Sequence, residues 1–189
     1  METTEGAANV LGTTHDVPSS KDCTLCHNGE PGRVLGFSAI QLSKSGPPPT
    51  LTSLASAGSL TVPPPAGVDY PVLGDPATAA ALGYLHANCG HCHNPHGWPG
   101  SFLSQHLRLN VAERTLETTA IWTSTVNQPT QWFRAAGITD RIVAGDPDHS
   151  AIAYRMADRG DSAQMPPKAT KQVDSVGLAA VRSWISSLP

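Results

Sequence analysis

Aromatic residues are scarce in this chain. They make up 5 % of the 189 residues, whereas glycine and proline contribute 17 residues each. This is a thin supply of core-forming side chains for a chain whose length suits one domain or two small ones. Bound cofactors would supply the missing apolar volume, so the composition fits a fold built around cofactors.

Basic blocks and long apolar runs are absent as well. The net charge is −3 and lysine and arginine form no block, so binding of nucleic acid through a basic stripe is not expected. No apolar run approaches the length of a membrane-spanning helix, so we expect no transmembrane segment in this chain. Residues 1–14 have neither the positive nor the apolar region of a signal peptide.

Cysteine occurs four times, and every copy belongs to a Cys-x-x-Cys-His motif. In such a motif the two thiols add to the two vinyl groups of a haem, and the histidine that follows binds its iron. The doubled motif therefore predicts two covalent haem c groups, and with them electron transfer. The predicted attachment and iron-binding residues are Cys23, Cys26, His27, Cys89, Cys92 and His93.

Two other uses of the cysteines compete with haem. A structural zinc site built from the four thiolates gives no role to His27 or His93, and the separation of the two motifs exceeds the usual spacing of zinc ligands. A pair of disulfides suits an oxidising compartment, but a Cys-x-x-Cys loop makes a strained, reducible disulfide. We therefore expect haem, with the zinc-stabilised interaction module as the less favoured alternative.

The expected location follows from haem attachment, which takes place outside the cytoplasm in bacteria. We expect a periplasmic or extracellular protein whose export signal, absent from this chain, has been removed. On this expectation, Met1 was introduced when the segment was excised.

The expected fold is mainly α, a cytochrome c-like helical fold with long irregular connections rich in proline and glycine. We divide it into an N-terminal haem module with a proline-rich connector (1–74) and a C-terminal cytochrome c-like haem module (75–189). In the first module, short helices are predicted after Ser19 or Ser20, over 37–44, and over 50–57 with Thr50 as its cap.

The second module opens with Asp75 as a helix cap and Pro76 at the first helical position. Leu82, Leu85, Cys89 and Cys92 then share one face of a helix that should end near residues 94–95. Residues 103–127 are poorly patterned and are interpreted as an insertion with a strand pair. Further helices are predicted from Asp146 and Pro147 to about residue 158, and from Asp174 to about residue 187, the last with Trp184 on the flank of its apolar face.

A sixth iron ligand decides whether a haem carries electrons or performs chemistry. Met165 is the best candidate for the second haem, because Pro166 and Pro167 stiffen its loop and a terminal helix follows. Filling a gap in the core is the weaker explanation for a methionine on such a polar loop.

Met1 is a poor candidate for the distal ligand of the first haem, which is therefore His15, a residue of the second module, or absent. Met156 is preferred narrowly to His86, although Met156 also suits core packing and His86 also suits a propionate or surface role. His91 cannot easily bind the iron of its own motif. The other histidines are expected to be surface residues or hydrogen-bond donors: His96, His106 and His149.

Several segments resemble the family of bacterial periplasmic di-haem c-type cytochromes. The most specific is Tyr-Leu-His-Ala-Asn-Cys-Gly-His-Cys-His-Asn-Pro at 84–95. The resemblance covers most of residues 22–188, and its other parts are residues 23–27, 34–37, 41–42, 141–147, 155–156, 165–167 and 184–185. The chain differs from the family in its proline-rich connector and in residues 103–127.

This resemblance implies a cytochrome c fold with His27 and His93 as proximal ligands and Met165 as a distal ligand. It also implies redox protein partners, such as a dehydrogenase or oxidase, since members are often encoded beside or fused to oxidoreductases. We therefore expect an electron carrier rather than an enzyme, or a subunit or domain of an oxidoreductase. The alternative is a di-haem peroxidase or oxygenase with one open haem, for which His86, His106 or Glu117 would serve as the acid-base group.

Overall fold

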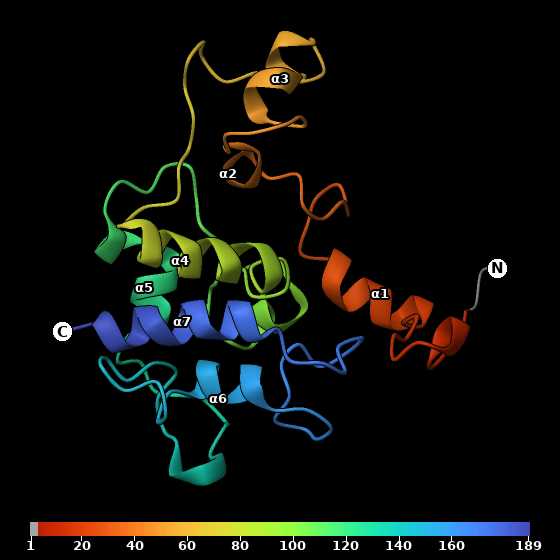
Figure 1. Cartoon of the computed structure of the whole chain (residues 1–189), viewed down its shortest axis with the longest axis vertical. Coiled ribbons are helices and arrows are strands. Elements are labelled where there is room, and N and C mark those ends of the chain that lie inside the picture. Colours follow the sequence, from red (N-terminus) through yellow and green to blue (C-terminus); the bar gives the residue numbers. More distant parts are fainter. Residues whose placement is uncertain (1–3) are drawn as a thin grey trace.

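The computed structural model describes residues 4–189 as a mainly helical chain with long irregular connections (Figure 1). Helices make up 38 % of the chain, and the β-structure of residues 4–189 is limited to isolated bridges. The expected mainly α class is thus confirmed. The α-helices are α1 (Ser20–His27), α2 (Ala39–Leu42), α3 (Leu51–Ser56), α4 (Pro76–Asn88), α5 (Ala120–Thr125), α6 (Ala151–Ala157) and α7 (Ser175–Ser187). Short 3-10 helices lie at Val10–Gly12, Trp98–Ser101, Leu116–Thr118 and Ala135–Gly137.

The core lies where α4 packs against α7, and α6 packs against α7 as well (Figure 1). Leu82 and Leu85 of α4 and Val181 of α7 are fully buried in it. The two helices approach closely at Gly177, because a Cβ at this position would overlap the ring of Tyr84. A residue without a side chain thus sets the distance between the helices.

Four predicted helix starts are confirmed. In each case the side-chain oxygen of the capping residue accepts a hydrogen bond from a backbone N–H of the first turn, where the helix itself offers no partner. The caps are Ser19 of α1, Thr50 of α3, Asp75 of α4 and Asp174 of α7.

The predicted start of the helix before Met165 is wrong by four residues. The Asp146 carboxylate accepts hydrogen bonds from the N–H groups of Asp148 and His149, which makes a separate turn rather than a helix cap. Helix α6 begins only after Ser150. The helix predicted over 37–44 is likewise shorter and covers Ala39–Leu42, with Ser38 as its cap.

The strand pair predicted within residues 103–127 is wrong. Residues 103–110 have no regular secondary structure, and the 3-10 helix Leu116–Thr118 and α5 follow them. Residues 103–127 are also part of the core rather than an insertion outside it, because Leu107, Leu109 and Ile121 are all buried in the main hydrophobic cluster. Trp184 is similarly more central than predicted, since its side chain is 1 % exposed.

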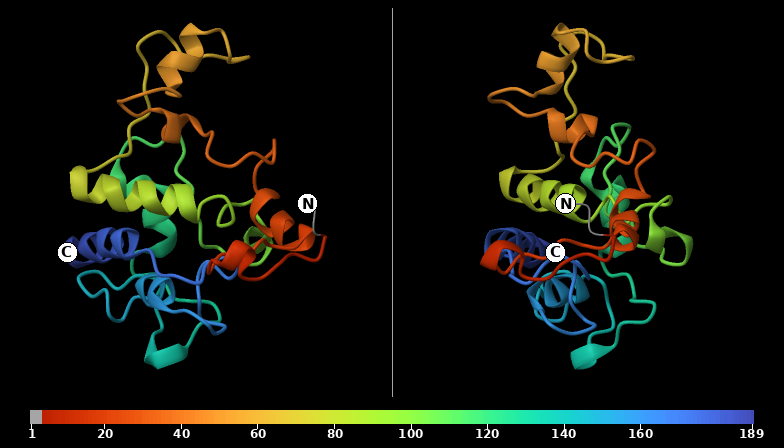
Figure 2. Two further views of the ribbon diagram at one scale, coloured as in Figure 1. Left: turned by 45° about the vertical axis from the view of Figure 1, so that its right-hand side comes forward. Right: turned by 90° about the vertical axis from the view of Figure 1, so that its right-hand side faces the viewer.

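The first half of the chain extends from this core in two directions. Helix α3 and the proline-rich connector lie at one end of the molecule, and α1 lies beside the turns that follow α4 (Figures 1 and 2). Ile40 of α2 is buried in the main core. The module boundary between residues 74 and 75 stays a prediction. No helix in the described part of the chain combines the length and the apolar character needed to cross a membrane.

Candidate functional site

The second Cys-x-x-Cys-His motif continues the last turn of α4. The Cys89 N–H donates to the Leu85 carbonyl at 2.9 Å, which is the final helical bond. The N–H groups of Cys92 and His93 then both donate to the Cys89 carbonyl, at 3.1 and 2.8 Å. Helix α4 ends earlier than predicted, at Asn88, because Cys89 leaves the helical conformation with φ −123°. The motif is nevertheless held as one compact turn.

His93 lies half-buried at the end of this turn. Its Nδ1 is buried and makes no hydrogen bond within the described residues. Burial, together with the nearby Arg155, lowers the pKa of His93 to about 4. The imidazole is therefore neutral at pH 7, which is the form that binds metals.

The loop after the second motif is fixed by Asn94, which is 1 % exposed. Its amide donates to the carbonyls of Gly90 and His91, at 2.8 and 3.0 Å. Its Oδ1 accepts from the N–H groups of His96 and Gly97. All four hydrogen bonds hold the backbone around His93, so this buried amide makes the motif rigid.

The first motif lies on α1, and its histidine has a defined orientation. The Nδ1 of His27 lies 2.7 Å from the carbonyl oxygen of Arg33. Arg33 has a left-handed backbone (φ 54°), which turns this carbonyl toward the ring. A histidine that donates Nδ1–H to a carbonyl leaves Nε2 free, and this arrangement is common for metal-binding histidines.

The two motifs, far apart in the sequence, pack directly against each other. Gly29, just after the first motif, lies against the carbonyl of His91 so closely that a Cβ at position 29 would overlap it. The Cys92 thiol donates to the Leu25 carbonyl at 3.5 Å. Near this contact, one donor atom each from Cys26, His91 and Cys92 lies within 4.8 Å of the others.

The cysteines differ in electrostatic environment. Hydrogen bonds from Cys92 and His91 lower the pKa of Cys26 to about 4. The same contact with Cys26, together with burial, raises the pKa of Cys92. Burial alone raises the pKa of Cys89 to about 12. The lowered pKa of Cys26 favours its thiolate form, beside Cys92 and His91.

The loop of Met165 lies at the end of the molecule where α4 ends and α1 lies (Figures 1 and 2). Arg155 anchors it twice, since its carbonyl accepts from the Met165 N–H at 2.9 Å and its Nε donates to the Ala163 carbonyl at 2.8 Å. Met165 itself is half-buried. The loop is thus held in place on the side of the molecule that carries both motifs.

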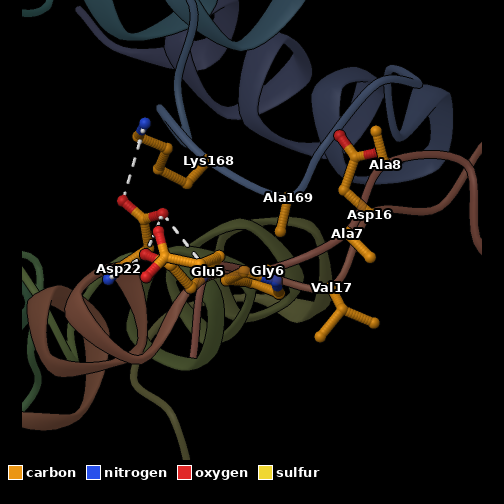
Figure 3. A pocket seen from close by; sticks show the side chains of 11 residues that line it. Glu5, Gly6, Ala7, Ala8, Asp16, Val17, Asp22, Lys168 and Ala169 are labelled. Atoms are coloured by element: carbon orange, nitrogen blue, oxygen red, sulfur yellow. Dashed lines mark hydrogen bonds and ion pairs between the residues drawn. The ribbon is translucent and has the colours of Figure 1, made fainter. Parts of the chain in front are cut away.

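The same loop contacts the N-terminal segment before the first motif. Lys168 lies 3.5 Å from the Asp22 carboxylate, and Lys171 lies 2.8 Å from that of Asp16. A pocket of about 300 Å³ opens beside the first of these ion pairs, with Gly6 and Ala169 in its wall (Figure 3). The loop predicted to serve the second haem is therefore tied to the helix of the first motif.

The two residues predicted for the first haem have other contacts. Met156 is 8 % exposed and belongs to the main hydrophobic cluster. His86 uses both ring nitrogens, because Nδ1 accepts from the Leu109 N–H at 3.1 Å and Nε2 lies 2.9 Å from the Ser38 hydroxyl. These bonds place the proton on Nε2.

The remaining candidates lie away from the two motifs or on the surface. Met1 lies outside the described residues. His15, His96, Glu117 and His149 are exposed, and the His149 ring bonds to the Asp146 carboxylate at 2.6 Å. The backbone of His106 exchanges two hydrogen bonds with the Ser124 hydroxyl.

His91 is the residue that sequence reasoning missed. Its position inside the motif directed attention to the iron of that motif, whereas the structure places it beside Cys26 of the other. The only local signal in the sequence is that His91 follows Ala87 by four residues, which is one helical turn. In the structure, the Ala87 carbonyl lies 3.4 Å from the His91 Nδ1.

In comparisons with protein-family models, curated proteins and solved structures, the chain matches none. The donor set itself fits haem c on chemical grounds. Each motif presents two thiols on one turn and an imidazole directly after them. The Nδ1 of His27 is bonded to a carbonyl, and the imidazole of His93 is neutral with its Nδ1 buried.

Proposed function

We propose that the chain is a di-haem c-type cytochrome that carries electrons between a redox donor and an acceptor outside the cytoplasm. The observation that carries this proposal is the His27 Nδ1 contact with the Arg33 carbonyl, in a chain whose cysteines all belong to Cys-x-x-Cys-His motifs. A zinc site of four thiolates leaves that orientation of His27 without a purpose.

The residues divide the work as follows. Cys23 and Cys26 would hold one haem and Cys89 and Cys92 the other, with His27 and His93 as iron ligands. When bound, a haem supplies an iron that accepts or releases one electron at a time. The chain contributes the fixed orientation of the His27 imidazole, through the Arg33 carbonyl, and a rigid backbone around His93, through the amide of Asn94.

The first test is the intact mass of the protein made with the c-type maturation machinery, together with its reduced-minus-oxidised spectrum. A mass increase of two haems with a c-type spectrum is the expected result. Serine in place of both cysteines of one motif should remove one haem and leave the other. An unmodified mass and a colourless protein would overturn the proposal.

The assignment of Met165 is tested by Met165→Ala in the haem-loaded protein. We expect one iron to become open to carbon monoxide in the reduced state and the methionine–Fe(III) charge-transfer band to disappear, because the sulfur ligand is lost. Met156→Leu is the matched control for a methionine buried in the core. If Met165→Ala leaves carbon monoxide binding and the band unchanged, Met165 is not the ligand.

A second candidate function is a di-haem peroxidase or oxygenase with one open haem. One observation favours it: Met156 is packed in the core and His86 has both ring nitrogens bonded. Carbon monoxide binding by the reduced, unmutated protein separates the two functions. Binding at one of the two irons favours the enzyme, and no binding favours the carrier.

A further inference from the structure

Three potential metal ligands lie together at the contact between the two motifs. None of them is a predicted iron ligand. One donor atom each of Cys26, His91 and Cys92 lies within 4.8 Å of the other two. Cys26 comes from α1, whereas His91 and Cys92 follow α4. All three side chains are half-buried. The set is sulfur, nitrogen and sulfur, which is a preferred combination for zinc.

The spacing of these atoms suits a tetrahedral ion. Zinc binds cysteine sulfur at about 2.3 Å and histidine nitrogen at about 2.0–2.1 Å, so neighbouring ligand atoms lie roughly 3.5 Å apart. Donor atoms within 4.8 Å of one another reach this arrangement by movements of about 1 Å. Rotation about the side-chain bonds of cysteine and histidine covers such movements without a change in the backbone.

The surroundings of His91 support the same use. Its Nδ1 lies 3.4 Å from the Ala87 carbonyl, one helical turn earlier. An imidazole that donates Nδ1–H to a backbone carbonyl presents Nε2 to a metal, as at many zinc sites. The amide of Asn94 bonds to the His91 carbonyl at 3.0 Å and fixes the backbone of this residue.

The geometry points to a zinc site formed by Cys26, His91 and Cys92 in the chain before haem attachment, with a water molecule as the fourth ligand. This site differs from a structural zinc site of four cysteines. Cys23 is exposed and Cys89 packs, partly buried, against the hydrophobic core, and neither belongs to the group of three.

Zinc and haem exclude each other at this site. Zinc binds both sulfurs as thiolates, so any proton that Cys26 or Cys92 still carries goes to solvent as two Zn–S bonds form. Haem attachment adds the same S–H groups across vinyl double bonds, so that a C–S bond forms and the proton goes to the neighbouring carbon. The haem-loaded chain therefore has no thiolate at positions 26 and 92, and a zinc-loaded chain has no free thiol there for haem.

The test is Co²⁺ and Zn²⁺ binding by the full chain made without the haem-attachment machinery and kept reduced. One Co²⁺ should bind per chain with a thiolate-to-cobalt charge-transfer band, and Zn²⁺ should displace it. Cys26→Ser, Cys92→Ser and His91→Ala should each weaken binding at least about 100-fold. The matched controls, Cys23→Ser and Cys89→Ser, should change it by less than about threefold.

His91→Cys guards against a simple loss of folding, because it replaces the ligand and should retain cobalt binding. Absence of binding in the unmutated chain would overturn the proposal. Equal losses in all four cysteine variants would also overturn it, in favour of a four-cysteine site.

Competition with haem gives a second readout. His91→Ala leaves both Cys-x-x-Cys-His motifs intact, so it should load two haems. Added zinc should lower the fraction of fully loaded chain in the unmutated protein and not in His91→Ala, as measured by intact mass. Failure of haem loading in zinc-free medium would count against the proposed function alone, whereas equal zinc sensitivity of both proteins would count against the zinc site alone.

Discussion

At the scale of single residues, His86 illustrates how a buried imidazole can link three segments. It lies on α4, accepts a hydrogen bond from the Leu109 N–H and reaches the hydroxyl of Ser38, the cap of α2. Its pKa is lowered from the ordinary 6.5 to about 4, chiefly by burial and also by the nearby Arg108, while Glu30 acts in the opposite direction. The folded protein therefore holds His86 neutral.

This pKa predicts how stability depends on pH. Between about pH 6.5 and pH 4 the unfolded chain binds a proton at His86 and the folded chain does not, so the stability falls as the pH is lowered through this range. The loss is on the order of 3 kcal/mol. Urea unfolding of the protein at pH 7 and pH 5 measures about half of this loss.

His86→Gln is the matched variant for this prediction. The glutamine amide offers one acceptor and one donor, as His86 does, but it does not titrate. The variant should keep the stability of the unmutated protein at pH 7 and lose less of it at pH 5. An equal loss in both proteins would show that another group controls the pH dependence.

At the scale of helices, the crossing of α4 and α7 depends on one position. A Cβ at residue 177 would overlap the ring of Tyr84, so Gly177→Ala must push the helices apart or turn the ring. Overpacking of this kind costs about 1–3 kcal/mol. We expect Gly177→Ala to lower the free energy of unfolding by that amount, as measured by urea titration.

A second substitution isolates the cause. Tyr84→Leu removes the ring, so in that background Gly177→Ala should cost less than it does alone. If the two losses simply add, the close approach of residues 84 and 177 does not limit the crossing. Val176→Ala is a control on the same helix, because Val176 is 79 % exposed.

Helix starts were the most predictable elements, because a cap acts over three residues. Ser19, Thr50 and Asp75 needed no knowledge of the rest of the fold. Asp146 had the same local signal, but its carboxylate caps a turn at residues 148–149 and the helix starts later. The local sequence fits either a helix cap or a turn cap at Asp146, and the packing of residues 140–150 favours the turn cap.

Contacts between distant segments were not predictable. The pattern of α7 alone predicts Trp184 on the flank of the apolar face. The tryptophan is buried because α4 and α6 both pack against α7. Residues 103–110 show no clean alternation, yet Leu107 and Leu109 enter the core. The position of His91 beside Cys26 depends on how α1 meets the end of α4, which no periodic pattern encodes.

At the scale of the whole molecule, polar contacts hold the first motif against the second half of the chain. The Arg108 guanidinium binds both carboxylate oxygens of Glu30, which follows the first motif by three residues. The side chains of this pair are 31 % and 16 % exposed. Two-point pairing of this kind gives orientation as well as energy.

We predict that this pair holds the two halves together after the connector is cut. With a protease site introduced at residues 58–62, which are mostly exposed, the fragments should co-elute at low salt. Arg108→Ala should weaken their association roughly tenfold, because Glu30 loses its partner. Gel filtration of the cut protein measures this.

Arg114→Ala is the control, since its guanidinium bonds to the nearby carbonyls of Val111 and Glu113. Equal association in the Arg108 and Arg114 variants would show that apolar contacts, such as those of Ile40, hold the two fragments together instead.

The absence of a side chain at Gly29 has a consequence for the order in which the protein is made. Gly29 lies against the His91 carbonyl, so the contact between the two motifs has no room for a side chain at this point. Under the proposed function, we expect both haems to be joined to the chain before this contact forms, with closing of the motifs as the last step of biogenesis. Residues 28–88 separate the two motifs, and this length of chain must fold back before the motifs meet.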